Sequence, residues 1–216
     1  ANDVITVNGF GAGLNAALTI NGRGGADAIN LNASGLTATS ANLSAETISQ
    51  TQAVSFGGTT TLDAGSTGSI TLNNSSNVFG TVAITNAGNA ALRDDGGFVL
   101  GTSAVGVSLT VQSAGAITQS GALSGDASLE KLGAGTMTLS ATNTFSGNAV
   151  VTGGTLGVTG GAAILDSTSV QMNGGTFGLN GSTETIGALF GATGSVTLGA
   201  GGALTVSPPA LSSSTL

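Results

Sequence analysis

The side chains of this chain that could carry acid–base chemistry are ten carboxylates and three basic groups. Glycosidases place two carboxylates on either side of the scissile bond, facing one groove. The densest charged cluster here is Arg93, Asp94 and Asp95, followed by two glycines. Because adjacent residues of a strand point to opposite faces, only one of these aspartates could line a given groove. We therefore expect a solvated corner ending in glycine and predict no catalytic residue. The carboxylates are Asp3, Asp27, Glu46, Asp63, Asp94, Asp95, Asp126, Glu130, Asp166 and Glu184.

The amino-acid composition excludes several other classes of functional site. The chain has no Cys and no His, so disulfides and thiol or imidazole metal sites are absent. It also has no Trp or Tyr to serve as a platform for sugar rings. We predict no cofactor-binding and no metal-binding residue.

Three further groups of polar residues have simple structural interpretations. Lys131 and Glu130 are expected to form an exposed pair at the start of a strand. The threonine runs 59–61 and 37–39 suggest an ice-binding face, but such a face needs threonine in register across many coils, and these runs are irregular. Five asparagines are candidates for interior or corner ladders in which amides bond along the axis. They are Asn73, Asn74, Asn77, Asn143 and Asn148.

The segment GRGGADAI, residues 22–29, resembles the calcium-binding nonapeptide of RTX repeats. The matching positions are Gly22, Gly25, Asp27 and Ile29. Arg23 stands where that pattern has glycine, and consecutive nine-residue copies are lacking. A plain turn aspartate at Asp27 is the favoured interpretation, and calcium binding is left as an alternative.

The charge balance limits the partners. The net charge is −7, and the basic residues are Arg23, Arg93 and Lys131. Nucleic acid and anionic membrane surfaces are therefore unfavourable partners. No apolar run approaches the roughly 18 residues of a membrane-spanning helix. No signal peptide is recognised at Ala1, which indicates a mature product or a segment of a longer protein.

The elements that would position these residues are short strands rich in Val, Ile, Leu and Thr, separated by Gly, Asn, Asp and Ser about every ten residues. Each alternates apolar with small or polar residues, which is typical of a half-buried strand. No helical period is found. Clear examples are the segments 4–7, 17–20, 28–31, 69–72, 82–85, 108–111, 136–139 and 195–198.

An internal repeat supports coiling of these strands. Residues 72–85 align with 139–152 at an offset of 67, and 48–54 align with 117–123 at an offset of 69. We interpret the offset of 67 as three coils of roughly 22 residues. Near the start, residues 2–9 resemble 26–33 at an offset of 24.

These patterns predict an all-β fold: a right-handed single-stranded parallel β-helix, or β-solenoid, with roughly 20–24 residues per coil. We expect one solenoid domain over residues 1–206, with repeat units at about 48–123 and 117–190. Residues 207–216 are expected to form a linker or exit segment. A β-sandwich is the alternative, but its core normally contains larger aromatic residues than this chain offers.

Residues 129–161 resemble the strand repeat of autotransporter passenger domains, and residues 48–123 are similar to the central repeats of filamentous-haemagglutinin-like exoproteins. The matching positions of the first segment are Lys131, Gly133, Gly135, Thr136, Leu139, Asn143, Thr144, Phe145, Gly147, Gly154, Thr155 and Leu156. Phe145 stands where tyrosine is frequent. The resemblance implies a parallel β-helix in a large, exported bacterial surface protein of the kind often described as an adhesin.

Our leading hypothesis is a structural segment, extracellular at the bacterial cell surface. It would act as a rigid stalk, an adhesive surface or a unit of a filament. Its expected partners are other copies, through end-to-end strand pairing, neighbouring solenoid segments, or a host or cell-surface glycan or protein. The alternatives are a carbohydrate-active β-helix enzyme and an ice- or surface-binding solenoid.

Overall fold

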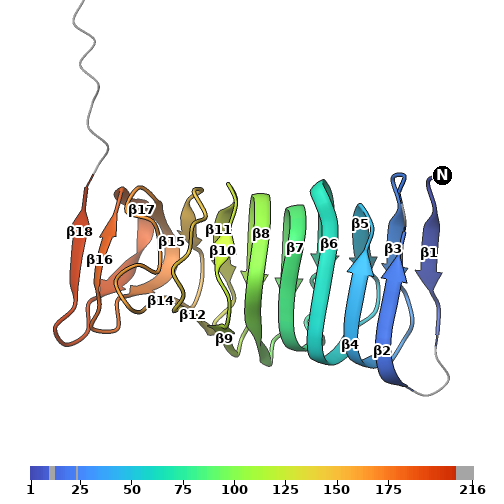
Figure 1. Ribbon diagram of the computed structural model, residues 1–216. Coiled ribbons are helices and arrows are strands. Elements are labelled where there is room, and N and C mark those ends of the chain that lie inside the picture. The colour runs from blue at the N-terminus through green and yellow to red at the C-terminus, as the bar shows by residue number, and fades with distance from the viewer. Residues whose placement is uncertain (10–12, 23, 208–216) are drawn as a thin grey trace, which may run out of the picture.

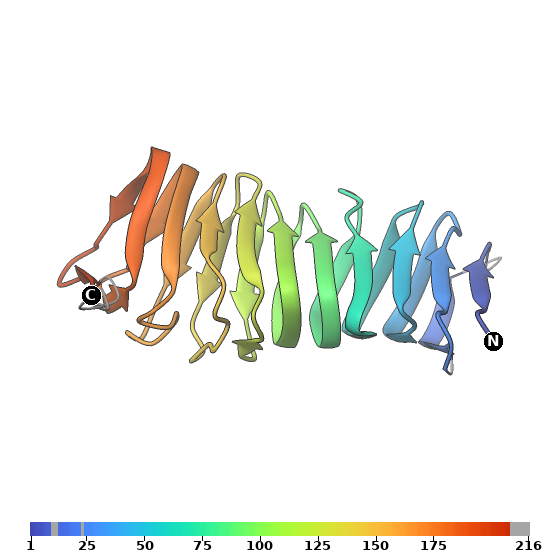
Figure 2. The ribbon, with the colours of Figure 1, turned by 90° about the horizontal axis from the view of Figure 1, so that it is seen from above.

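The computed structural model describes residues 1–9, 13–22 and 24–207, so Arg23 and residues 208–216 of the expected linker lie outside the described residues. Within this part all pairings between strands are parallel, and the strands follow one another along a single axis (Figures 1 and 2). The described residues form no helix of the length and hydropathy that crossing a membrane requires.

The strands are β1 (Val4–Val7), β2 (Leu14–Asn21), β3 (Ala28–Leu31), β4 (Leu36–Ser44), β5 (Thr47–Gln50), β6 (Val54–Leu72), β7 (Val78–Arg93), β8 (Gly97–Gln112), β9 (Ala116–Gln119), β10 (Leu123–Ser124), β11 (Ser128–Leu132), β12 (Thr136–Leu139), β13 (Ala149–Val151), β14 (Thr155–Val158), β15 (Ser169–Gly178), β16 (Thr183–Ile186), β17 (Ala188–Thr197) and β18 (Ala203–Val206).

Each coil contributes one segment to each of three faces. The first face stacks β1, β3, β5, residues 69–72, 89–93 and 108–112, β11, β13, and residues 169–172 and 188–191. The second face stacks residues 36–38, 54–56, 78–79 and 97–100, β9, β12, β14, and residues 176–178 and 195–197. The third face includes residues 17–21, 40–44, 60–63, 82–84 and 103–104, β10, β16 and β18.

The strand register gives the length of each coil. On the first face Val4 pairs with Ala28 at the start of the rod. In the middle of the rod Asn89 pairs with Ser108, and Ser108 pairs with Ser128. The first coil is therefore longer than the later ones, which have about 20 residues each. The chain thus forms a parallel β-solenoid of about 10 turns, as the sequence predicted. At a strand spacing of about 4.8 Å, this makes a rod roughly 50 Å long.

The register explains the similarity between residues 2–9 and residues 26–33. These segments lie in consecutive coils, where β1 pairs with β3. The register corrects the interpretation of the longer repeat as three coils. Because the later coils are shorter than the sequence suggested, the repeat spans three coils plus one face. Leu72 accordingly ends a first-face segment, whereas Leu139 ends β12 on the second face.

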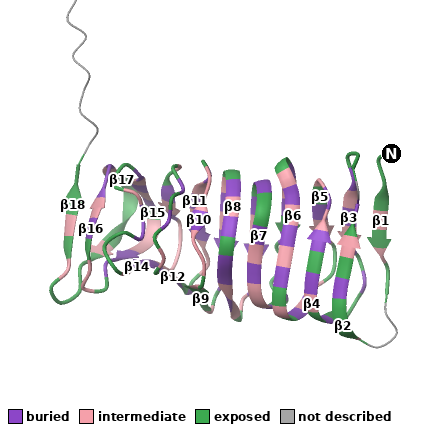
Figure 3. Cartoon of the chain, viewed as in Figure 1, coloured by how far each residue is buried: buried purple, intermediate pink, exposed green. Residues whose placement is uncertain are grey.

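The core is a single column of inward side chains along the axis. Buried and outward residues alternate in the strands, so buried patches alternate with intermediate or exposed ones along each strand (Figure 3). Phe56, Phe79 and Phe98 stack in consecutive coils of the second face, with ring centroids 6.4 and 6.1 Å apart. A column this narrow is filled mainly by Leu, Ile, Val and Ala, so a chain with 7 Phe and no Trp or Tyr can fill it.

Corners between faces need backbone conformations and close approaches that a side chain would block. Gly97 begins a second-face segment with φ +94°, and a Cβ atom there would lie 2.2 Å from the carbonyl oxygen of Ala116 in the next coil. Glycine is required at this position on both counts.

We expect Phe79→Ala to lower the free energy of unfolding by about 3–5 kcal/mol, because it opens a cavity between two stacked rings. The matched control is Phe190→Ala, since Phe190 is 45% exposed at the end of the rod. Urea denaturation followed by circular dichroism measures both. Equal losses in the two variants would contradict the stacked-ring core.

Candidate functional site

The polar residues that could do chemistry lie mostly at the corners, where strand pairing stops. At these corners a side-chain oxygen of one coil accepts a hydrogen bond from a backbone N–H of the preceding coil. Asn77 Oδ1 accepts from Val54 N at 3.0 Å, Asp94 Oδ2 from Phe79 N at 2.7 Å, and Asn143 Oδ1 from Leu123 N at 2.7 Å. Asp27, Glu46 and Glu184 act in the same way. Buried N–H groups that leave the strand ladder are thereby satisfied.

The expected solvated corner at Arg93, Asp94 and Asp95 is wrong for Asp94. Its side chain is only 2% exposed, and besides Phe79 N it accepts Gly96 N at 2.8 Å. A tight corner leaves two N–H groups without strand partners, and one carboxylate serves both. Asp95 instead points outward and forms a two-pronged ion pair with Arg93, at 3.0 and 2.9 Å. The two aspartates therefore do not converge on one groove.

The Arg93–Asp95 pair affects the titration of both partners. The hydrogen bonds from the guanidinium hold the pKa of the Asp95 carboxyl below its usual value, and they raise the pKa of Arg93. Both side chains are about one-third exposed, so solvent screens this pair. It is a surface feature of the corner.

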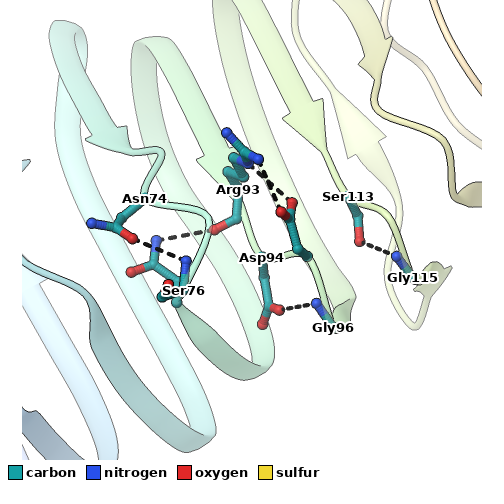
Figure 4. A network of polar contacts seen from close by, with 9 residues as sticks. Asn74, Ser76, Arg93, Asp94, Gly96, Ser113 and Gly115 are labelled. Carbon is teal, nitrogen blue, oxygen red and sulfur yellow. Dashed lines mark hydrogen bonds and ion pairs between the residues drawn. The ribbon is translucent and has the colours of Figure 1, made fainter.

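The same corner uses one turn motif in three consecutive coils (Figure 4). Asn74 Oδ1 accepts from Ser76 N, Asp94 Oδ1 from Gly96 N, and Ser113 Oγ from Gly115 N, at 2.8 to 3.0 Å. In each case the side chain of residue i bonds the backbone of residue i+2, which is the usual Asx or Ser turn. The row of turns is structural.

The expectation that Lys131 is exposed is also wrong. Strand β11 alternates outward and inward residues, and Lys131 faces inward like Leu129, with no exposed surface. Its Nζ donates to the carbonyl oxygens of Leu132 at 2.6 Å, Gly133 at 3.0 Å and Gly153 at 3.4 Å. The ammonium thus joins two consecutive corners. Burial lowers the pKa of Lys131 to about 8.

Glu130 and Lys131 consequently do not form a pair. Glu130 faces outward from the strand and accepts a hydrogen bond from Thr152 Oγ1 of the next coil at 3.0 Å. Neighbouring residues of a strand point apart, so this separation follows from strand geometry.

The amide ladder is confirmed for two of the five asparagines. Asn77 and Gln50 exchange hydrogen bonds of 2.8 and 3.0 Å, and Asn143 bonds Gln119 in the equivalent way. Asn77 and Asn143 are buried and also donate to backbone carbonyls of the following coil, Arg93 and Ala163. Asn73 and Asn148 are exposed, and Asn74 makes the corner turn described above.

The candidate calcium position near Asp27 lies beside a pocket of about 140 Å³. Carboxylates from three coils line this pocket: Asp27, Glu46 and Asp63. Asp27 Oδ1 accepts from Asp3 N at 2.7 Å, and Glu46 Oε2 accepts from Asp27 N at 2.7 Å. The latter bond lowers the pKa of Glu46. Across residues 1–9, 13–22 and 24–207, no three carboxylates are placed to hold a metal ion. The hydrogen bond that Asp27 accepts from Asp3 N is of the same kind as the corner bond of Asp94.

The other carboxylates are dispersed. Asp126 accepts from Ser146 Oγ at 2.8 Å, and Asp166 is exposed. Glu184 is fully buried on the third face, and burial raises the pKa of its carboxyl.

The threonine runs do not form one face. In the run 59–61, Thr60 is buried in the column while its neighbours point outward. The outward row on the first face mixes hydroxyls with an amide: Thr47, Ser69, Asn89, Ser108 and Ser128 lie in register on successive coils. These uncharged polar side chains can form hydrogen bonds with water at the surface of a chain that has few charged residues.

Asp94→Ala should lower the free energy of unfolding by about 2–3 kcal/mol, because the variant leaves the buried Phe79 N–H and the Gly96 N–H without a hydrogen-bond acceptor. Asp95→Ala is the matched control and should change stability little, since its ion pair is exposed. Urea denaturation at neutral pH distinguishes them. A larger loss for the control would contradict the corner role of Asp94.

Lys131 should make the fold more stable as pH rises. Its pKa is about 8 when folded and near 10.5 when unfolded, so between these values the unfolded chain binds more protons. The stability gain is absent below about pH 8 and complete above about pH 10.5, and should reach roughly 1–3 kcal/mol. Urea denaturation across this range tests it, with Lys131→Met as the variant that lacks the gain.

This titration is unusually free of interference. Lys131 is the chain's single lysine, and there is no Tyr, Cys or His to titrate in the same range. Loss of stability between pH 8 and 10.5 in the native chain would contradict the lowered pKa of Lys131.

The chain was compared with known families and proteins. The family model described as "Repeats of unknown function (DUF5649)" matches residues 11–86 and 87–152. Comparison with curated proteins and with solved structures gives no significant match. The two consecutive family matches cover more than half of the chain. The chain therefore belongs to the DUF5649 family of repeats.

Proposed function

We propose that this chain is a rigid structural segment of a secreted bacterial surface protein, in which it acts as a stalk that holds other parts of the protein away from the cell. The observation that carries this proposal is the continuous parallel stack of coils from β1 to β18 around one core column. Each coil is held to the next by backbone hydrogen bonds and buried apolar contacts. Bending would have to break many of them together.

The polar residues support a mechanical role. Four buried polar side chains form hydrogen bonds with the backbone of neighbouring coils: Asp94, Asn77, Asn143 and Lys131. Such side chains fix one coil against the next, and they are not presented to a ligand. The outward rows of Ser, Thr and Asn keep the rod soluble without many charges.

Export to the cell surface rests on different support, the resemblance of residues 129–161 to autotransporter passenger repeats and of residues 48–123 to haemagglutinin-like exoproteins. The absence of Cys is compatible with export, since no thiol has to be kept reduced. An adhesive surface on the same rod is the second role that this resemblance suggests.

Rigidity is tested by distance measurement between spin labels. The chain has no Cys, so Thr6→Cys and Thr205→Cys give one outward label in the first coil and one in the last. We expect a single narrow distance distribution near 40–50 Å, from about nine spacings of 4.8 Å. A broad distribution would contradict the stalk. Surface location is tested separately by antibody labelling of intact cells of the source bacterium, and label found only after lysis would contradict export.

A further inference from the structure

We propose that a calcium ion binds at a corner between the third and the first face, held by the carboxylates of Asp27 and Glu46. The ion would join two consecutive coils of the rod. The site does not depend on the proposed function, since it requires neither export nor a surface location.

Carboxylates gather at this corner. Residues 1–64 contain four acidic side chains, Asp3, Asp27, Glu46 and Asp63. Asp3, Asp27 and Glu46 directly precede β1, β3 and β5, so they occupy equivalent positions in three consecutive coils. Asp63 ends the third-face segment of the following coil. All four therefore lie along one edge of the rod.

Neighbouring carboxylates in this row repel each other. Equivalent positions of consecutive coils are about 4.8 Å apart, and like charges directly opposite each other on paired strands are destabilising. Among the residues that the structure describes, the two basic side chains bond elsewhere: Arg93 pairs with Asp95, and Lys131 donates to carbonyl oxygens around Gly133. A bound cation would offset this repulsion.

Asp27 supplies a buried oxygen that needs a partner. Its side chain is 2% exposed, and Oδ1 accepts from Asp3 N at 2.7 Å, while the buried Oδ2 has no hydrogen-bond partner. Asp94 differs, because each of its two oxygens accepts a backbone N–H. A buried carboxylate oxygen without a partner is costly, and a bound water or ion is a usual explanation for one.

The same side chain lines the pocket of about 140 Å³, together with Glu46, Asp63 and Ser44. Glu46 and Asp63 each use one oxygen to accept a backbone N–H, from Asp27 at 2.7 Å and from Gly65 at 3.0 Å. The second oxygen of each carboxylate is not used in these bonds. The pocket thus combines negative charge with oxygen atoms that can coordinate an ion.

A glycine keeps the space beside the buried oxygen open. A Cβ atom at Gly22 would lie 2.7 Å from Asp27 Oδ2. Any other residue at this position would therefore fill the place next to the oxygen that lacks a partner.

Spacing along the rod selects two of the three carboxylates of the pocket. Asp27 and Asp63 are two coils apart, which is about 10 Å, so one ion cannot bind both. Asp27 and Glu46 lie in neighbouring coils, 19 positions apart in the chain. An ion between them would complete its coordination with water and the Ser44 hydroxyl, which lines the same pocket.

The donor atoms favour calcium. Carboxylate, hydroxyl and water oxygens suit hard cations, whereas softer metals prefer nitrogen or sulfur ligands. Calcium accepts six to eight oxygens in flexible geometry, while magnesium requires a nearly regular octahedron. Carboxylates that backbone hydrogen bonds fix in two separate coils cannot rearrange freely into an octahedron. With only two carboxylates, we expect a dissociation constant of about 0.1–1 mM.

Urea denaturation of the native chain tests the site, with calcium chloride compared against a chelator. Calcium at about 10 mM should raise the ratio of folded to unfolded chain by about 10- to 100-fold, because only the folded chain brings the two carboxylates together. Magnesium chloride at the same concentration controls for ionic strength. An equal shift with magnesium would mean general charge screening and would overturn the proposal.

Two variants remove charge and keep the shape of the side chain. Asp27→Asn and Glu46→Gln each retain a side-chain oxygen that can accept the backbone hydrogen bond, and each should lose the calcium-dependent shift. The matched control is Asp126→Asn, since Asp126 lies outside the pocket and bonds Ser146. The control should keep the full shift. If the two variants also keep it, calcium binds elsewhere and the proposed site is wrong.

Calorimetric titration of the folded native chain with calcium decides the question even if a variant does not fold. We expect one calcium ion per chain. Absence of binding would mean that water alone meets Asp27 Oδ2, and it would overturn the proposal. Arg23 lies outside the described residues, and its guanidinium is the competing cation. Binding that appears only in Arg23→Gln would assign the pocket to arginine and would also overturn the calcium site.

Discussion

Parallel backbone pairing between successive coils is the constraint on which the rest of this structure depends. Because each strand must find its partner one coil later in the chain, the lengths of all three faces and corners are fixed together. Inward positions then line up along the axis, so a single column made mainly of Leu, Ile, Val and Ala suffices as a core. A chain with little aromatic content can form such a narrow core, whereas a β-sandwich needs wider layers.

The same constraint explains where the polar residues lie. Strand pairing stops at the corners, and an N–H group that turns inward there has no partner from the ladder. Asp94, Asn77 and Asn143 supply acceptors from the next coil, and Lys131 supplies donors to corner carbonyls. In this fold, a buried carboxylate or ammonium group therefore indicates a contact at a corner and is not by itself evidence of a catalytic site.

The sequence predicts the strands and the solenoid well, since alternation of residue types and the turn residues report local geometry directly. It is less informative about individual side chains. Leu129 and Lys131 share the same parity in β11, so alternation places both inward, but the charge of lysine suggests the opposite. Asp94 follows the end of β7, where alternation no longer applies, and its burial depends on an N–H group of the neighbouring coil. The bond from Lys131 to Gly153 and the bond from Phe79 to Asp94 each join residues of different coils, 22 and 15 positions apart, so neither is local in sequence.

The difference between the repeat and the coil has a functional consequence. The longer repeat unit is three coils plus one face, so equivalent residues of consecutive units point in different directions. Gln50 and Asn77 hold the corner after the first face, while Gln119 and Asn143 hold the corner after the second. A ligand-binding residue repeated in every unit would therefore not form a line along one side of the rod. Residues that bond one coil to the next work equally well on any face, and these are the ones the two units share.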